Sequence, residues 1–159
     1  MNTKRKYQHM SNMNNDVLNT KIEAIFYEVQ RAIDTVDLTN LSKLFTVSFF
    51  KKYKKSSKKL FLNNDKIHIE NIEVKDITNF KYNNKSIAVD ISFTAITYTN
   101  HDKNTVHWRI RHLATLFSAN KEIGKSSVYK QSFKQRWFFV YEAQSLKVQK
   151  IKGIYLKQD

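Results

Sequence analysis

The sequence predicts an α+β domain in which N-terminal helices pack on an antiparallel sheet. Its 159 residues suit one domain, and 41% hydrophobic and 13% aromatic residues exceed what a disordered chain carries. Apolar residues recur every three or four positions up to residue 62 and alternate after residue 65. Helices followed by strands in one chain are typical of the α+β class.

The first part of the chain predicts three helical segments. Asp16 is expected to cap the first, whose apolar positions share one face: Val17, Leu18, Ile22, Ile25, Phe26, Val29, Ile33 and Val36. Asp37 begins a second, short helix. Thr46 is expected to cap a third segment, Val47 to Leu62.

The remainder predicts a meander of strands separated by polar turns. The first strand has a one-residue slip at Asn71, which predicts a β-bulge. The alternating segments are Ile67–Ile77, Ile87–Tyr98, Val106–His112, Phe133–Tyr141 and Leu146–Tyr155.

No repeat or second composition regime interrupts the chain, so residues 16–156 are expected to form one domain after a disordered basic tail at residues 1–15. The absence of cysteine excludes disulfides and thiolate metal sites and favours a reducing compartment. Two glycines and no proline exclude a glycine-rich phosphate loop. No apolar run is long enough to span a membrane, and the first residues show no signal-peptide core.

The net charge of +14 is unevenly distributed along the chain. Residues 47–63 carry a net charge of +6 and residues 101–159 a net charge of +8, whereas the other segments are nearly neutral. Such an excess favours an anionic partner, either a lipid surface, a nucleic acid or an acidic protein. A Lys- and Asn-rich composition, as an AT-rich genome produces, is the alternative explanation.

The third helical segment predicts a basic amphipathic helix. Phe49, Phe50 and Tyr53 share a face and lysines flank it, as on helices that lie on anionic membranes. The predicted membrane- or phosphate-binding residues are Phe49, Phe50, Lys51, Lys52, Lys54, Lys55, Lys58 and Lys59. The alternative is a core-packed helix with a solvated lysine face.

A second basic set lies on the later strands. Alternation places Arg109 with Arg111, and Lys134 with Arg136, on one face each, where guanidinium groups suit phosphate. The predicted nucleic-acid-binding residues are Arg109, Arg111, Lys130, Lys134 and Arg136. The alternative is an exposed sheet face that carries polar residues without a ligand.

Nothing in the spacing of titratable residues demands catalysis or a metal. His107 and His112 are five residues apart, which suits metal ligation on neither a strand nor a helix. Asp90 with His68 or His112 is the one acid–base pair to consider, and a surface role is favoured for Asp90. We therefore expect no enzyme activity, no metal and no cofactor.

Several segments resemble the Tim44-like domain family. They are Phe26-Tyr27-Glu28-Val29-Gln30-Arg31-Ala32, the rhythm of Asp37, Leu38, Leu41, Leu44 and Thr46, the strand Ile67–Ile77, Trp137-Phe138-Phe139, and Leu146, Val148 and Ile151. Leu146 replaces the tryptophan of the family pattern, and residues 106–127 are longer and more basic than that pattern. The resemblance implies an NTF2-like cone, a strongly curved sheet closed by helices, and a non-enzymatic attachment role.

These observations lead to a hypothesis of an intracellular binding or tethering module that engages an anionic membrane surface and a protein partner. It would be peripheral at a membrane, on the mitochondrial matrix side or at the bacterial cytoplasmic membrane. The alternative is a mitochondrial large-subunit ribosomal protein of the Tim44-like type that binds rRNA. A small-ligand pocket inside the cone is a third hypothesis.

Overall fold

The computed structural model describes residues 15–62, 67–84, 86–99, 131–142 and 144–153. Within them, helices come first and strands follow, which confirms the predicted α+β class. The elements are α2 (Asn15–Asp34), α3 (Leu38–Leu44), α4 (Val47–Leu62), β1 (Ile67–Tyr82), β2 (Ile87–Thr99), β3 (Gln131–Glu142) and β4 (Ser145–Gly153). The predicted tail lies almost wholly outside the described residues, as does the predicted strand Val106–His112.

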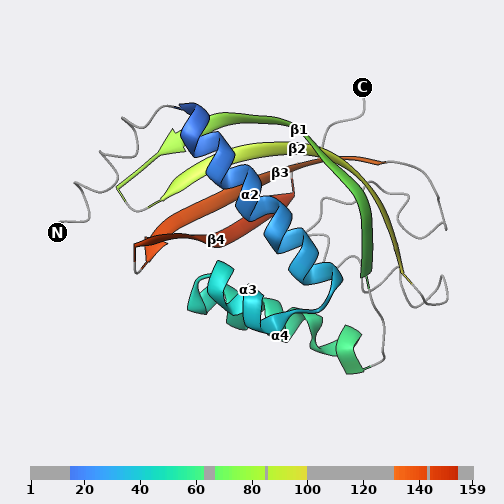
Figure 1. The fold of residues 1–159 in the computed structure, drawn as a ribbon. Helices are drawn as coiled ribbons and strands as arrows, with labels where there is room; N and C mark the ends of the chain where they lie inside the picture. The colour runs from blue at the N-terminus through green and yellow to red at the C-terminus, as the bar shows by residue number, and fades with distance from the viewer. Residues whose placement is uncertain (1–14, 63–66, 85, 100–130, 143, 154–159) are drawn as a thin grey trace.

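The four described strands form one antiparallel meander in the order β1-β2-β3-β4. The sheet is open, with β1 and β4 as its outer strands. Helix α2 crosses one face of this sheet, and α3 and α4 lie together at the side of β4 (Figure 1). The helices therefore cover one face of the sheet and do not cover the other face of β3 and β4.

Two of the three predicted helix caps are confirmed. Asp37 Oδ1 accepts a 3.0 Å hydrogen bond from the Asn40 amide, and Thr46 Oγ1 accepts one of 3.2 Å from the Phe49 amide. The prediction for Asp16 is wrong, because Asn15 is already helical and Asp16 lies in the first turn of α2. A carboxylate in the first turn still interacts favourably with the positive end of the helix dipole. An acidic residue near a helix start is therefore compatible with the first turn as well as with the cap.

The turn between α2 and α3 places a β-branched residue in an unfavourable conformation. The Asp37 amide donates to Ala32 O and the Val36 amide to Ile33 O, the two hydrogen bonds of a Schellman motif. That motif needs a left-handed residue at Val36, whose φ is 55°. Glycine is the usual residue there, since a Cβ atom makes this conformation costly.

Strand β1 is longer than predicted because it contains more than one irregularity. The predicted bulge at Asn71 is confirmed by a register shift between Glu70 and Glu73 and by a φ of 51° at Asn71. A further shift surrounds Asn79, whose φ is 55°. These shifts break the alternation of apolar residues. The alternation therefore predicts a strand that ends at Ile77, whereas the pairing with β2 continues to Tyr82.

The core forms between α2 and the inner face of β2, β3 and β4. Phe26 of α2 packs against Phe93, with ring centroids 4.8 Å apart, and against Trp137 at 5.2 Å. Trp137 is 0% exposed, and its Nε1–H donates to Gln135 Oε1 at 2.9 Å, so its one polar group has a partner. The Val74 amide donates to the Tyr27 hydroxyl at 3.0 Å and fixes α2 against β1.

Helix α4 is attached to the outer strand β4 through the two residues that precede it. Phe45 forms a parallel bridge with Val148, and the Thr46 amide donates to Val148 O at 2.9 Å. The Phe45 ring packs on Phe49 at 4.5 Å and on Tyr53 at 5.7 Å. One face of α4 is therefore fixed by the core, and this contact decides which side chains the helix exposes.

Candidate site for an anionic surface

Helix α4 has one apolar face and one lysine face. Phe49 and Tyr53 are 8% and 5% exposed, and Ser57 is also buried, where its hydroxyl donates to Tyr53 O at 2.7 Å. The exposed side chains include Lys51, Lys52, Lys54, Lys55 and Lys58. Because α4 contains no aspartate or glutamate, this face carries uncompensated positive charge within the helix itself.

The aromatic residues of the predicted membrane site are not all at the surface. Phe49 belongs to the core, so it is unavailable for insertion into a bilayer in this structure. Phe50 is half-buried against the core, and the Lys54 ammonium lies 5.1 Å from its ring centroid. The structure thus keeps the predicted lysines together while assigning Phe49 to packing. The side chain of Lys59 lies outside what the structure describes.

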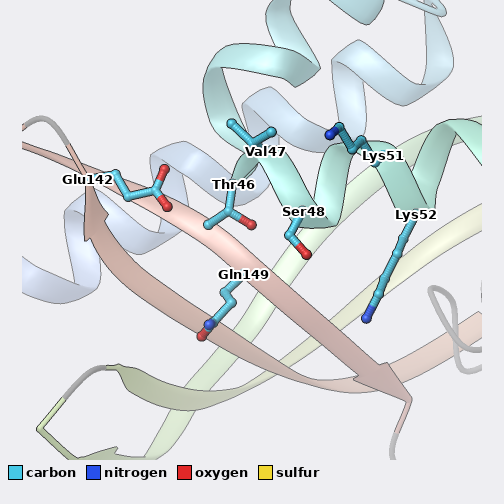
Figure 2. Close-up of a pocket in the computed structure, with 7 residues that line it drawn as sticks. All are labelled: Thr46, Val47, Ser48, Lys51, Lys52, Glu142 and Gln149. Carbon is cyan, nitrogen blue, oxygen red and sulfur yellow. The ribbon is translucent and has the colours of Figure 1, made fainter.

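A groove of about 640 Å³ lies where α4 begins beside β4. Its lining residues are Thr46, Val47, Ser48, Lys51, Lys52, Glu142 and Gln149, shown in Figure 2. The Lys52 side chain extends from α4 toward the C-terminal strands, whereas Glu142 lies at the opposite end of the groove (Figure 2). Val47 is 67% exposed, the only large apolar side chain of the described part of α4 that is fully at the surface.

Two further lysines, not among the predicted site residues, lie on β4. Phe138 of β3 pairs with Lys150, and the Lys150 and Lys152 ammonium groups lie 5.8 and 5.9 Å from the Phe138 ring centroid. Both side chains therefore stand on the outer face of the sheet, over one aromatic ring. The alternation of Lys150 and Lys152 around the buried Ile151 is the signal that would have identified them.

The charges of these lysines act on one another. Contact with Lys152 is the main reason why the pKa of Lys150 lies below its ordinary value, and the charge of Lys152, burial and the charge of Lys52 lower it further. Lys52 belongs to α4 and Lys150 to β4, and the two elements meet where the Thr46 amide donates to Val148 O at 2.9 Å. Lys52 of the α4 lysine face and Gln149, the residue before Lys150, line the same groove, so the two sets of lysines come from elements that meet at this junction.

The predicted nucleic-acid-binding residues are only partly assembled. Arg136 is engaged by Asp90, with Nε–Oδ1 and Nη2–Oδ2 distances of 2.7 and 3.1 Å. Lys134 lies on the same strand face as Arg136. Arg109, Arg111 and Lys130 lie outside the described residues.

The surface role expected for Asp90 is wrong, because the residue is 1% exposed and its carboxylate is held by Arg136. Burial raises its pKa, but hydrogen bonds from Arg136 and from Asn79 Nδ2 at 2.8 Å, with the charges of Arg136 and Lys134, outweigh burial and lower the pKa below its ordinary value. The acid–base pair considered from the sequence is thus disfavoured at Asp90. The side chain of His68 and the whole of His112 lie outside the described residues. Among the residues described, no cluster of three or more histidine or acidic side chains is placed to hold a metal.

Comparisons with known proteins show the fold and no family. No protein-family model matches the chain, and no curated protein matches it. A solved structure of the intermembrane space region of the chloroplast protein ARC6 is similar, with a TM-score of 0.56 and 8% identity over 84% of this chain and 93% of that chain. The resemblance to the Tim44-like family remains a prediction. No helix in the described part of the chain has the length and apolar character needed to cross a bilayer.

Proposed function

We propose that this protein is a non-catalytic binding module that engages an anionic membrane surface through the exposed lysines of α4. The observation that supports this proposal best is the division of α4 into a buried aromatic face and a lysine face without carboxylates. The aromatic side chains that the structure describes on α4, which would favour insertion into a bilayer, pack in or against the core. Binding would therefore be peripheral and mainly electrostatic.

The number of exposed lysines is sufficient for such binding. Each basic residue near an anionic membrane contributes about 1 kcal/mol, and clusters of four to eight are typical of anionic-lipid binding. Lys51, Lys54 and Lys58 lie within one quadrant of the helix surface, at spacings of three and four residues. Because exposed charges are screened by salt, affinity should fall steeply as ionic strength rises.

The rRNA alternative is less well supported by the described residues. Of its five predicted contacts, Arg136 is committed to Asp90, and Arg109, Arg111 and Lys130 lie outside the described residues. The α4 surface consists of lysines, which act as point charges and lack the bidentate geometry with which arginine recognises phosphates. The same lysines would bind an acidic surface on a protein partner of the tether.

Vesicle co-sedimentation of a triple variant tests the proposal. Lys51→Gln/Lys54→Gln/Lys58→Gln should lower affinity for vesicles of phosphatidylcholine and phosphatidylserine by about a hundredfold, as three lysines each contribute about 1 kcal/mol. The matched control is Lys21→Gln/Lys43→Gln/Lys81→Gln, three exposed lysines of α2, α3 and β1.

Both variants lose three charges, so they separate a localised site from net charge. A much larger loss in the α4 variant supports the proposal. An equal loss in both variants would show that affinity follows overall charge, and unchanged binding in the α4 variant would refute the proposed surface.

A further inference from the structure

We propose that Lys52, Lys150 and Lys152 form a binding site for one phosphomonoester group at the junction of α4 and β4. The inference deepens the proposed function, on which it rests only for the membrane as the source of the phosphate. These three lysines would thus have a defined ligand, unlike the other exposed lysines of α4.

Identifiable contacts bring two of the side chains together and hold the elements that carry all three against each other. Lys150 and Lys152 extend over the same Phe138 ring, at 5.8 and 5.9 Å from its centroid, so neither spreads away from the other. The Phe45–Val148 bridge and the 2.9 Å hydrogen bond from the Thr46 amide to Val148 O hold α4 against β4.

Lys52 comes from the helix side of this junction. It lines the groove with Gln149, the residue that precedes Lys150, and extends toward the strands (Figure 2). Its charge contributes to the lowered pKa of Lys150, which supports the proximity of the two ammonium groups. Among the ion pairs between described residues, none joins these three lysines to a carboxylate.

This arrangement matches a phosphomonoester in charge and in hydrogen bonding. Near pH 7 such a group carries a charge of about −1.5 to −2 and three acceptor oxygens, one for each ammonium group. A bound phosphate would offset the repulsion among the lysine charges. The lysine whose charge is repelled most strongly by its neighbours would therefore be stabilised most by the ligand. A carboxylate supplies less charge and fewer acceptors, and it should bind more weakly.

The competing explanation is that Lys150 and Lys152 protect an outer strand from pairing with other chains, as charged residues on such strands commonly do. That explanation involves no ligand and gives no role to Lys52. The two explanations therefore predict different results when phosphate is added.

Titration of the full chain with inorganic phosphate, followed by amide chemical shifts, tests the site. We expect saturable shifts at Lys52, Lys150 and Lys152, and a loss of affinity of about fivefold in each of Lys52→Met, Lys150→Met and Lys152→Met. Methionine keeps an apolar stem of similar shape, and loss of one of three like charges reduces repulsion in the fold.

The matched control is Lys81→Met, which removes an exposed lysine of β1, the outer strand at the opposite edge of the sheet from β4. It should leave phosphate affinity unchanged. Absence of saturable shifts, or an equal loss of affinity in the control, would overturn the site and favour strand protection.

Vesicles distinguish the source of the phosphate. Phosphatidic acid carries a phosphomonoester and phosphatidylserine does not, so a preference for phosphatidic acid that Lys150→Met abolishes would assign the site to a lipid headgroup. Phosphate binding without this preference supports the site with the free anion as its ligand. Loss of binding to all vesicles with intact phosphate titration would refute the proposed membrane function and leave the site standing.

Discussion

Replacing Trp137 by alanine removes the largest fully buried side chain among the residues that the structure describes. The indole packs against Phe26 at 5.2 Å and Phe139 at 6.1 Å, and its Nε1–H bonds to Gln135 at 2.9 Å. Truncating a buried tryptophan to alanine costs about 3–5 kcal/mol through lost burial and the cavity left behind. Since domains are stable by only about 5–15 kcal/mol, the variant should lose a large part of its stability.

Urea and thermal unfolding followed by far-UV circular dichroism measure this effect. At about 2–4 °C per kcal/mol for a chain of this size, the melting temperature should fall by roughly 6–20 °C. Phe138→Ala is the matched control, because Phe138 is the next residue on β3, is half-buried and faces outward. It should cost about 1 kcal/mol. Equal losses in the two variants, or an unchanged melting temperature in Trp137→Ala, would refute the assignment of strand faces.

Three further predictions concern single features of the fold. Burial raises the pKa of Tyr53 to about 12, so the neutral phenol contributes stability that is fully present below its ordinary pKa of 10.0. About 3 kcal/mol of the free energy of unfolding should be lost as the pH rises from 10 to 12. Urea unfolding measured across this pH range should show the loss in the wild type and much less of it in Tyr53→Phe. The pKa of Asp90 is lowered chiefly by Arg136 against the effect of burial, so its contribution is present above the ordinary pKa of 3.8 and lost as pH falls below it; Asp90→Asn should be less stable at neutral pH and should lose less on acidification, and a parallel acid transition in both proteins would contradict the ion pair. Val36→Gly should raise the free energy of unfolding by about 0.5–1 kcal/mol by relieving a left-handed conformation, whereas Val36→Ala, which keeps the Cβ, should not.

Local signals in the sequence predicted most of the described fold. Asp37 and Thr46 were recognisable as caps because each accepts a hydrogen bond from an amide three residues later, a pattern written in consecutive residues. The extension of β1 beyond Ile77 was not predictable, because register shifts around Asn79 break the alternation on which strand prediction depends. The prediction of Val36 on the apolar face of the first helix is wrong, because α2 ends at Asp34 and Val36 is exposed in a left-handed conformation that an apolar stripe does not indicate.

The candidate site could be predicted only in part. Periodicity correctly separated the aromatic face of α4 from the lysines, but it does not state what covers the aromatic face, so Phe49 was assigned to a membrane and lies in the core. Alternating apolar residues predict the strand from Leu146, but they do not predict that Lys150 and Lys152 lie over one aromatic ring of the neighbouring strand. The junction that places β4 beside the start of α4 joins residues about a hundred positions apart in sequence, which only tertiary structure reveals.

Binding of the wild-type chain to anionic vesicles and to structured RNA, in parallel and at low and high salt, tests the central claim most directly. We expect vesicle binding that is strong at low salt, falls steeply at high salt and depends on the exposed lysines of α4. Tight, steeply salt-dependent RNA binding without vesicle binding would contradict it and favour the ribonucleoprotein alternative.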